Sequence, residues 1–187
     1  GWTVFNNKGK PVRQYEPFLS SLADRPHQFE FARKEGLSPT LFYDPVERVV
    51  AKLQPNHTYE KAVFDAWQEK TFDVNDTVLL DPQTDPDVRT FFTRLPDSDY
   101  LPTWHEARKN GQKGAGEKAA ADKAAVHAGT PTTAYFDSAA RIFLTITHNR
   151  FASANGMVEE HYPNRVEARC ARRPTPTCAP IWISLAM

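Results

Sequence analysis

Tyr43-Asp44-Pro45-Val46-Glu47-Arg48-Val49-Val50 is the stretch that decides the fold. It runs from an aromatic residue and an aspartate through a proline turn into a β-branched segment. An aspartate in this place accepts hydrogen bonds from the backbone just after it and so nucleates a tight turn. Strand-forming residues flank the turn on both sides. The stretch therefore predicts a β-hairpin.

The same pattern occurs twice more, as an aromatic residue, Asn or Asp, three residues, a basic residue and a β-rich run. The copies are Phe5-Asn6-Asn7-Lys8-Gly9-Lys10-Pro11-Val12 and Phe136-Asp137-Ser138-Ala139-Ala140-Arg141-Ile142-Phe143, and Phe64-Asp65 is similar to the start of a degenerate copy. We expect each unit to be a hairpin whose aromatic packs inward and whose basic residue flanks the turn. One hairpin buries too little surface to be stable, so the units are expected to pair in a larger sheet.

Between the repeats the pattern becomes helical. Three short helices are expected, over 88–95, 102–109 and 117–128. The predicted fold is mainly β with a helical insertion at about 85–128. We expect four regions: β strands over 1–80, the helical insertion over 81–130, β strands over 131–168, and an atypical, disordered tail over 169–187.

Composition limits the possible partners and functions. The chain has 187 residues, with 23 Lys plus Arg and 23 Asp plus Glu, so its formal net charge is zero. A neutral chain lacks the field that usually drives binding to nucleic acid. Nor does the sequence contain an apolar run long enough for a membrane span. Because the chain starts at Gly1 within a strand-like segment, we interpret it as a slice of a longer protein.

The polar residues form no established catalytic or metal-binding motif. The six histidines are scattered, so we expect single packed or surface side chains. Seven aspartates lie between residues 73 and 99, where caps and turns are the expected roles and a calcium site lacks its loop motif. Cys170 and Cys178 are either two free thiols or one small-loop disulfide. No cofactor and no metal are expected.

Two sets of residues carry a resemblance to a known family. Tyr43 to Arg48, followed by Pro55-Asn56-His57-Thr58-Tyr59-Glu60-Lys61 and Phe64-Asp65, resembles one unit of the YD-repeat of RHS proteins. More broadly, residues 1 to about 162 resemble the RHS-bearing part of the B component (TcB) of bacterial Tc insecticidal toxin complexes. The further stretches that carry this likeness are 1–17 and 95–104.

The family's turn glycine is present only as Gly9, and Glu47 and Ala140 replace it in the other units. If that position needs a positive φ, each replacement costs on the order of 1 kcal/mol. The residues assigned to the structural repeat are Phe5, Asn6, Gly9, Lys10, Tyr43, Asp44, Arg48, Tyr59, Phe64, Asp65, Phe136, Asp137 and Arg141.

The resemblance implies a structural role. The parent would be a secreted β-sheet shell that, with a C component, encapsulates a toxic effector for delivery through a pore-forming A component. No catalytic residue carries over, so we interpret the chain as a non-catalytic segment of that shell. The alternative is a carbohydrate- or cell-surface-binding β module, in which Trp67 and Trp104 stack on sugars. An enzyme fragment is a third possibility.

Overall fold

The computed structural model describes residues 1–18, 30 and 33–166. It is mainly β, as expected from the sequence. The strands are β1 (Trp2–Phe5), β2 (Pro11–Tyr15), β3 (Thr40–Tyr43), β4 (Val49–Leu53), β5 (Tyr59–Phe64), β6 (Gln68–Phe72), β7 (Thr132–Phe136), β8 (Ile142–Ser153) and β9 (Gly156–Arg165). The tail predicted over 169–187, with Cys170 and Cys178, lies outside the described residues.

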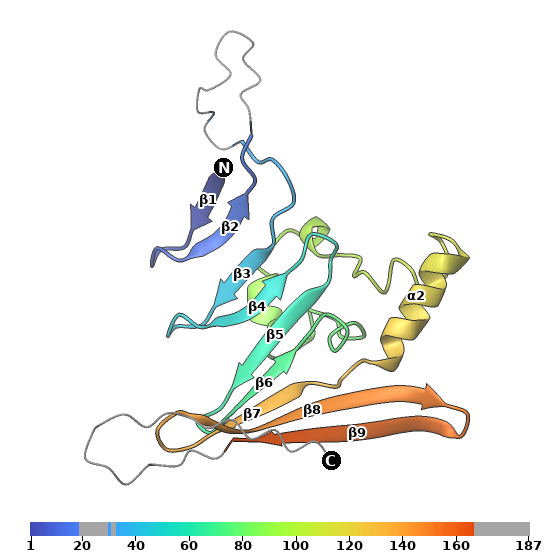
Figure 1. Ribbon diagram of the computed structural model, residues 1–187. Helices are drawn as coiled ribbons and strands as arrows, with labels where there is room; N and C mark the ends of the chain where they lie inside the picture. The colour runs from blue at the N-terminus through green and yellow to red at the C-terminus, as the bar shows by residue number, and fades with distance from the viewer. Residues whose placement is uncertain (19–29, 31–32, 167–187) are drawn as a thin grey trace, which may run out of the picture.

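The strands follow one another as an antiparallel meander (Figure 1). β3 to β9 form one seven-stranded sheet in chain order, and β1 and β2 form a separate two-stranded sheet. The two sheets meet at β2 and β3, where the Tyr43 hydroxyl donates a hydrogen bond to the carbonyl of Pro11 at 2.8 Å. Every described connection between neighbouring strands is thus a hairpin, except those from β2 to β3 and from β6 to β7.

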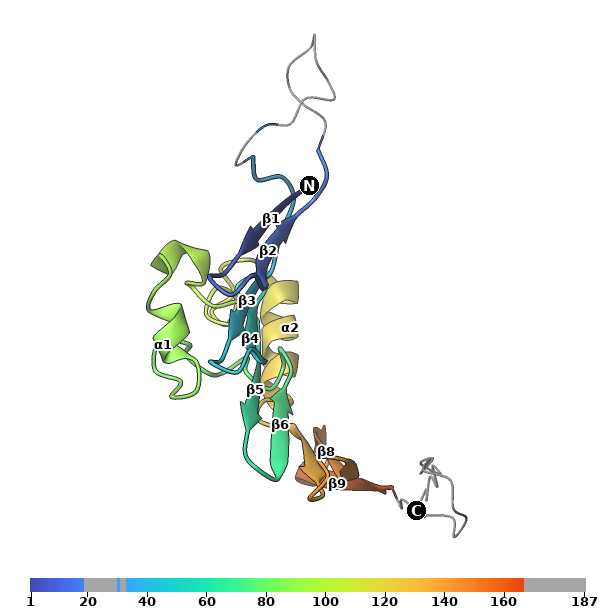
Figure 2. The same cartoon turned by 90° about the vertical axis from the view of Figure 1, so that its left-hand side faces the viewer.

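The segment between β6 and β7 packs on β4 and β5 to form the core. Figure 2 shows that the part of it around α1 (Arg89–Phe92) covers one side of β3–β5. Phe92 is fully buried, and its ring centroid lies 5.3 Å from those of Phe42, Tyr59 and Tyr100. Aromatic pairs at this distance add to the stabilisation from apolar burial. This aromatic cluster fixes the insertion to the sheet.

The helices of the insertion are shorter than expected. The helix predicted over 88–95 is reduced to α1, because the amides of Arg94 and Leu95 bond to carbonyls three residues back, which tightens the chain into turns after Phe92. A 3₁₀ turn, η1 (Asp97–Asp99), follows. The helix predicted over 102–109 is wrong: this stretch forms a succession of turns, in which the Arg108 amide bonds to the carbonyl of His105, three residues back.

α2 (Ala115–Val126) corresponds to the helix expected over 117–128. Its Ala121 is fully buried. The end of the segment is held by β8, since Arg150 Nη1 donates to the carbonyl of Ala128 at 2.8 Å. Small side chains therefore let α2 lie close to the sheet.

Candidate functional site: a rim of hairpin turns

The turns of four hairpins lie side by side along one edge of the molecule, on the left in Figure 1. We call this edge the turn rim and define it as residues 5–10, 43–48, 64–68 and 136–141. Lateral contacts join its members. Lys8 Nζ donates to the Pro45 carbonyl at 2.6 Å, and the Phe136 amide donates to the Trp67 carbonyl at 2.9 Å.

Three of these turns are built by the same pair of hydrogen bonds. Oδ1 of Asp44 accepts the amide N–H of Val46 at 3.0 Å and that of Arg48 at 2.9 Å. The corresponding oxygen of Asn6 accepts both bonds at 2.9 Å, and that of Asp137 accepts them at 2.8 and 3.0 Å. The side chain thereby satisfies two backbone donors that a tight turn leaves free. The Asn or Asp of the sequence repeat is the residue that shapes each turn.

The fourth position of each turn has left-handed backbone. φ is +77° at Gly9, +70° at Glu47 and +56° at Ala140, so the position does need a positive φ. A turn with the same backbone hydrogen bonds spans residues 54–58, with φ of +66° at His57, and the sequence repeat did not include it. Its signal was Pro55, which follows Gln54 as Pro45 follows Asp44. The repeat pattern does not match this turn, because Gln54 stands where the other turns have Asn or Asp.

The basic residue of the repeat pairs with the aspartate of its own turn. Arg48 Nε lies 2.7 Å from Asp44 Oδ2, and Arg141 Nε lies 2.9 Å from Asp137 Oδ2. The side-chain hydrogen bond from Arg141 lowers the pKa of Asp137. At Asp44, desolvation opposes the effect, yet the backbone and side-chain hydrogen bonds from Arg48 still lower the pKa.

The first hairpin has no carboxylate for its own basic residue, because Asn6 takes the place of the aspartate. Lys10 instead forms a 3.0 Å ion pair with Glu47 of the next turn. Neighbouring turns are thus joined by an ion pair as well as by the Lys8 hydrogen bond.

The remaining repeat residues behave less uniformly. Tyr43, Phe64 and Phe136 are half-buried, but Phe5 is 58% exposed, so the expectation that each aromatic packs inward is wrong for the first hairpin. β1 and β2 form only a two-stranded sheet, which offers Phe5 no apolar surface to pack on. The Asp65 turn is shorter than the others, with Asp65 Oδ1 accepting the Trp67 amide at 3.3 Å.

Tyr59 lies in the core, away from the turn rim. Its hydroxyl donates to Asp85 Oδ2 at 2.7 Å, and burial, followed by the hydrogen bond to this carboxylate, raises its pKa. Asp85 also accepts hydrogen bonds from Lys61, which is equally buried. Asp85 is one of the seven aspartates expected in caps and turns, so this buried ion pair was not predicted.

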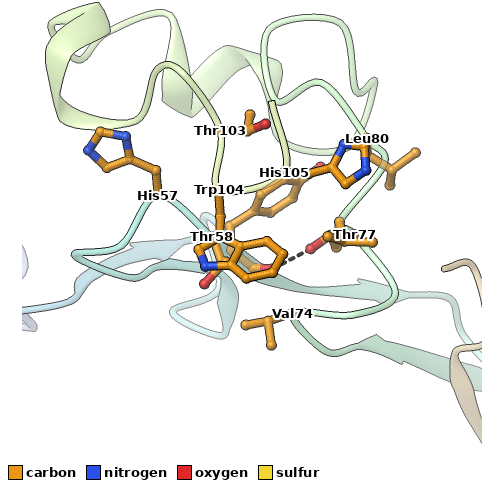
Figure 3. A pocket seen from close by; sticks show the side chains of 10 residues that line it. His57, Thr58, Val74, Thr77, Leu80, Thr103, Trp104 and His105 are labelled. Atoms are coloured by element: carbon orange, nitrogen blue, oxygen red, sulfur yellow. Dashed lines mark hydrogen bonds between the residues drawn. The ribbon is translucent and has the colours of Figure 1, made fainter. Parts of the chain in front are cut away.

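The cavity that His57, Tyr59, Thr77 and Trp104 help to line is too small for a substrate. It measures about 10 Å³, which holds at most one water molecule. Figure 3 shows His57 and His105 on opposite sides of it, while the Thr77 hydroxyl donates to the Tyr59 carbonyl at 2.5 Å. His57 Nδ1 lies 2.9 Å from the Pro102 carbonyl. The imidazoles and the hydroxyl therefore do not form a nucleophile–base pair.

Residues 1–18, 30 and 33–166 contain neither a metal-binding cluster nor a membrane-spanning helix. No cluster of three or more His, Cys, Asp or Glu side chains there could hold a metal ion. No helix in the same part of the chain is both long and apolar enough to cross a membrane.

The two tryptophans proposed for sugar stacking differ in accessibility. Trp67 is 60% exposed on the turn rim. The Arg108 guanidinium lies 4.5 Å from the Trp104 ring centroid and occupies a face of that ring. Trp104 is therefore less available for stacking than the alternative function requires.

The fold belongs to the class of antiparallel β meanders in which hairpin turns line one edge. No family model matches the chain, and no curated protein matches its sequence. Solved Tc toxin structures do match its fold. A crystal structure of TcdB2-TccC3 has a TM-score of 0.52 at 20% identity, and it covers 90% of this chain and 6% of that one.

Two further structures agree with this match. A crystal structure of TcdB2-TccC3-Cdc42 has a TM-score of 0.53 at 18% identity, and a Tc holotoxin pore of Photorhabdus luminescens has a TM-score of 0.52 at 21% identity. Each covers 89% of this chain and 6% of the other. The likeness to the Tc B component read from the sequence is thus confirmed at the level of the fold. The chain spans a small part of the proteins that it matches.

Proposed function

We propose that this chain is a non-catalytic structural segment of an RHS-repeat toxin-complex protein, and that its sheet forms part of a shell around a toxic effector. The observation that carries this proposal is the match of nearly the whole meander to a short portion of Tc toxin structures. The segment's role is to contribute strands to the wall and so to exclude solvent and proteases from the cargo.

The open edges of the sheet support this role. Within the described residues, nothing pairs with the outer edge of β9 or with that of β1. An unpaired strand edge presents free N–H and C=O groups to another strand. A wall segment needs such edges, because neighbouring segments of the parent extend the sheet there.

The proposed partners follow from the same role. They are the rest of the same shell, a C component, a pore-forming A component and the enclosed effector, all in a secreted complex. The matched structures contain TcdB2 with TccC3, which supports a C-type protein as the first partner to test.

A chimera tests the proposal directly. The matched portion of TcdB2 is replaced by this chain, and the product is copurified with TccC3 by size-exclusion chromatography. We expect a stable complex of unchanged size, because the two portions have the same fold. A matched control carries Phe92→Asp, which places a charge in the aromatic core, and it should fail to assemble. A folded chimera that does not bind TccC3 would contradict the proposal.

A glycan array separates the shell from the carbohydrate-binding alternative. If the chain is a segment of the shell, the full chain should bind no glycan on the array. Retention that is lost in Trp67→Ala would instead support the binding module.

A further inference from the structure

A second, larger cavity lies beside the small one and shares His57 and Trp104 with it. We call it the outer cavity; residues 55–57, 102, 104, 107, 108 and 113 line it. It measures about 260 Å³, which is room for a small polyatomic ion together with water. Three of its lining side chains bear nitrogen atoms that can bind a ligand, namely those of His57, Arg108 and Lys113. His57 is far from the other two in sequence, so it is the fold that brings them together.

The imidazole of His57 is held by one nitrogen and has the other free. Nδ1 lies 2.9 Å from the Pro102 carbonyl, and a carbonyl oxygen only accepts, so Nδ1 carries the proton. Nε2 of the neutral ring is then an acceptor, and within the described residues it has no hydrogen-bond partner. In Figure 3 the ring points away from Thr77. His57 therefore offers one oriented acceptor to a ligand.

The guanidinium of Arg108 is fixed in place but retains free donors. Nε donates to Glu117, Nη1 donates to the Trp104 carbonyl at 3.1 Å, and the guanidinium lies 4.5 Å from the Trp104 ring centroid. A guanidinium has five N–H groups, so these two bonds leave both N–H groups of Nη2 unused. A guanidinium held in this way binds an oxyanion without losing much further side-chain freedom.

Lys113 supplies the uncompensated charge of the outer cavity. Within the part of the chain that the structure describes, its ammonium forms neither an ion pair nor a hydrogen bond. Arg108 is neutralised by Glu117, but Glu117 does not line the cavity. Among the described residues, none that lines the cavity carries a carboxylate. The charge of the cavity therefore favours an anion.

We propose that the outer cavity binds the hydrogen phosphate ion. Its unprotonated oxygens accept hydrogen bonds from Arg108 and Lys113, and its single P–O–H group donates to Nε2 of His57. The same acceptor disfavours sulfate, which has a similar shape and charge but no proton to donate. A site that hydrogen-bonds a ligand hydroxyl rejects an analogue without it, because the partner is left unpaired. The inference rests on this cavity alone and not on the proposed shell function.

Anion selectivity tests the proposal. The full 187-residue chain is titrated with phosphate, sulfate and methyl phosphate at constant ionic strength, and the indole N–H signal of Trp104 is followed by nuclear magnetic resonance. At about pH 7.5 methyl phosphate is mostly a dianion without a P–O–H group, so it distinguishes an esterified phosphate from the free ion. We expect a dissociation constant on the order of 1 mM for phosphate. Sulfate and methyl phosphate should each bind about tenfold more weakly.

Two variants separate the acceptor from the charge. His57→Asn removes the Nε2 acceptor, while asparagine tolerates the left-handed backbone at this position. It should abolish the preference for phosphate over sulfate, a ratio that a merely structural role of His57 would not change. Lys113→Gln should weaken the binding of both anions by about tenfold and leave their ratio unchanged.

Lys109→Gln is the matched control for charge. It removes the same charge from a lysine that pairs with Glu106 and does not line the outer cavity, so phosphate should bind it as it binds the wild type. Circular dichroism verifies that each variant keeps the fold. The proposal is overturned if the wild type does not bind phosphate or binds sulfate equally well. It is also overturned if the preference survives His57→Asn, or if Lys113→Gln and Lys109→Gln have the same effect.

Discussion

Lys61 Nζ lies 2.8 Å from Oδ1 and 2.9 Å from Oδ2 of Asp85, and the two side chains are 6% and 2% exposed. A buried ion pair offsets its desolvation only when further hydrogen bonds complete it. Asp87 Oδ2 accepts one such bond from the Lys61 ammonium at 2.7 Å, and the Tyr59 hydroxyl donates another to the Asp85 carboxylate. The pair anchors the insertion to β5 beside the aromatic core.

Replacing Asp85 by Asn is expected to lower the free energy of unfolding by about 3 kcal/mol, because the buried Lys61 ammonium loses its main counter-charge. Urea denaturation monitored by circular dichroism measures the change. Asp87→Asn is the matched control. The Asp87 carboxylate is 39% exposed, so its loss should cost less than about 1 kcal/mol. Equal losses of unfolding free energy in the two variants would show that burial does not determine how strongly these carboxylates stabilise the fold.

The left-handed turn positions predict opposite effects for glycine and alanine. Ala140→Gly should raise the free energy of unfolding by up to about 1 kcal/mol, because it relieves strained backbone. Gly9→Ala should lower it by a similar amount. Thermal denaturation measures both changes.

A control in the same turn distinguishes backbone strain from a general effect of glycine. Ala139 does not have a positive φ, so Ala139→Gly should be neutral or destabilising. If Ala139→Gly and Ala140→Gly behave alike, the strain argument is wrong.

The hairpins could be predicted from sequence because their interactions are local. Asp44 contacts atoms two and four residues ahead, so residue types and spacing contain the information. Strand β6 (Gln68–Phe72) was indicated only by the degenerate Phe64-Asp65 unit before it, since the strand itself is largely polar and is stabilised by pairing with β5 and β7. The β-propensity of its residues alone does not indicate such a strand.

Long-range contacts left no comparable sequence pattern. Lys61 and Asp85 are 24 residues apart, and Asp85 stands before a proline in a plausible helix cap. The lateral contact between Lys8 and Pro45 spans 37 residues. The repeat residues were thus identifiable from the sequence, whereas the turn rim that they form required the order of strands in the sheet.

Acid should weaken the hairpin of Asp137. Its pKa is lowered by the hydrogen bond from Arg141, so the stabilisation is present above the ordinary aspartate pKa of about 3.9 and is lost as the pH falls through the lowered value. Asp137→Asn retains an oxygen for the two backbone bonds but has no charge. Its urea midpoint should therefore vary less with pH between about 5 and 2 than that of the wild type.

Arg141→Gln provides the control for this acid effect. It removes the guanidinium, so the urea midpoint should vary less with pH over the same range. The double variant Asp137→Asn/Arg141→Gln should differ little from either single variant. Additive effects of the two single variants would contradict a shared origin in this pair.

Pro163 disfavours self-pairing of the outer edge of β9 where no neighbouring segment covers that edge. The Val166 amide donates to the Phe143 carbonyl at 2.9 Å, and Pro163 lies opposite Ile146 in the same antiparallel ladder. Because the direction of the backbone groups alternates along such a ladder, the nitrogen of Pro163 faces outward. It therefore removes one donor from an exposed edge, as prolines on edge strands commonly do.

Pro163→Val should restore this donor and promote pairing of β9 edges, with aggregation well above that of the wild type in light-scattering and thioflavin T assays. Asn164→Val is the matched control, because it adds a similar side chain where the N–H faces β8. Equal aggregation of the two variants would mean that added hydrophobicity, and not the outward N–H, is responsible.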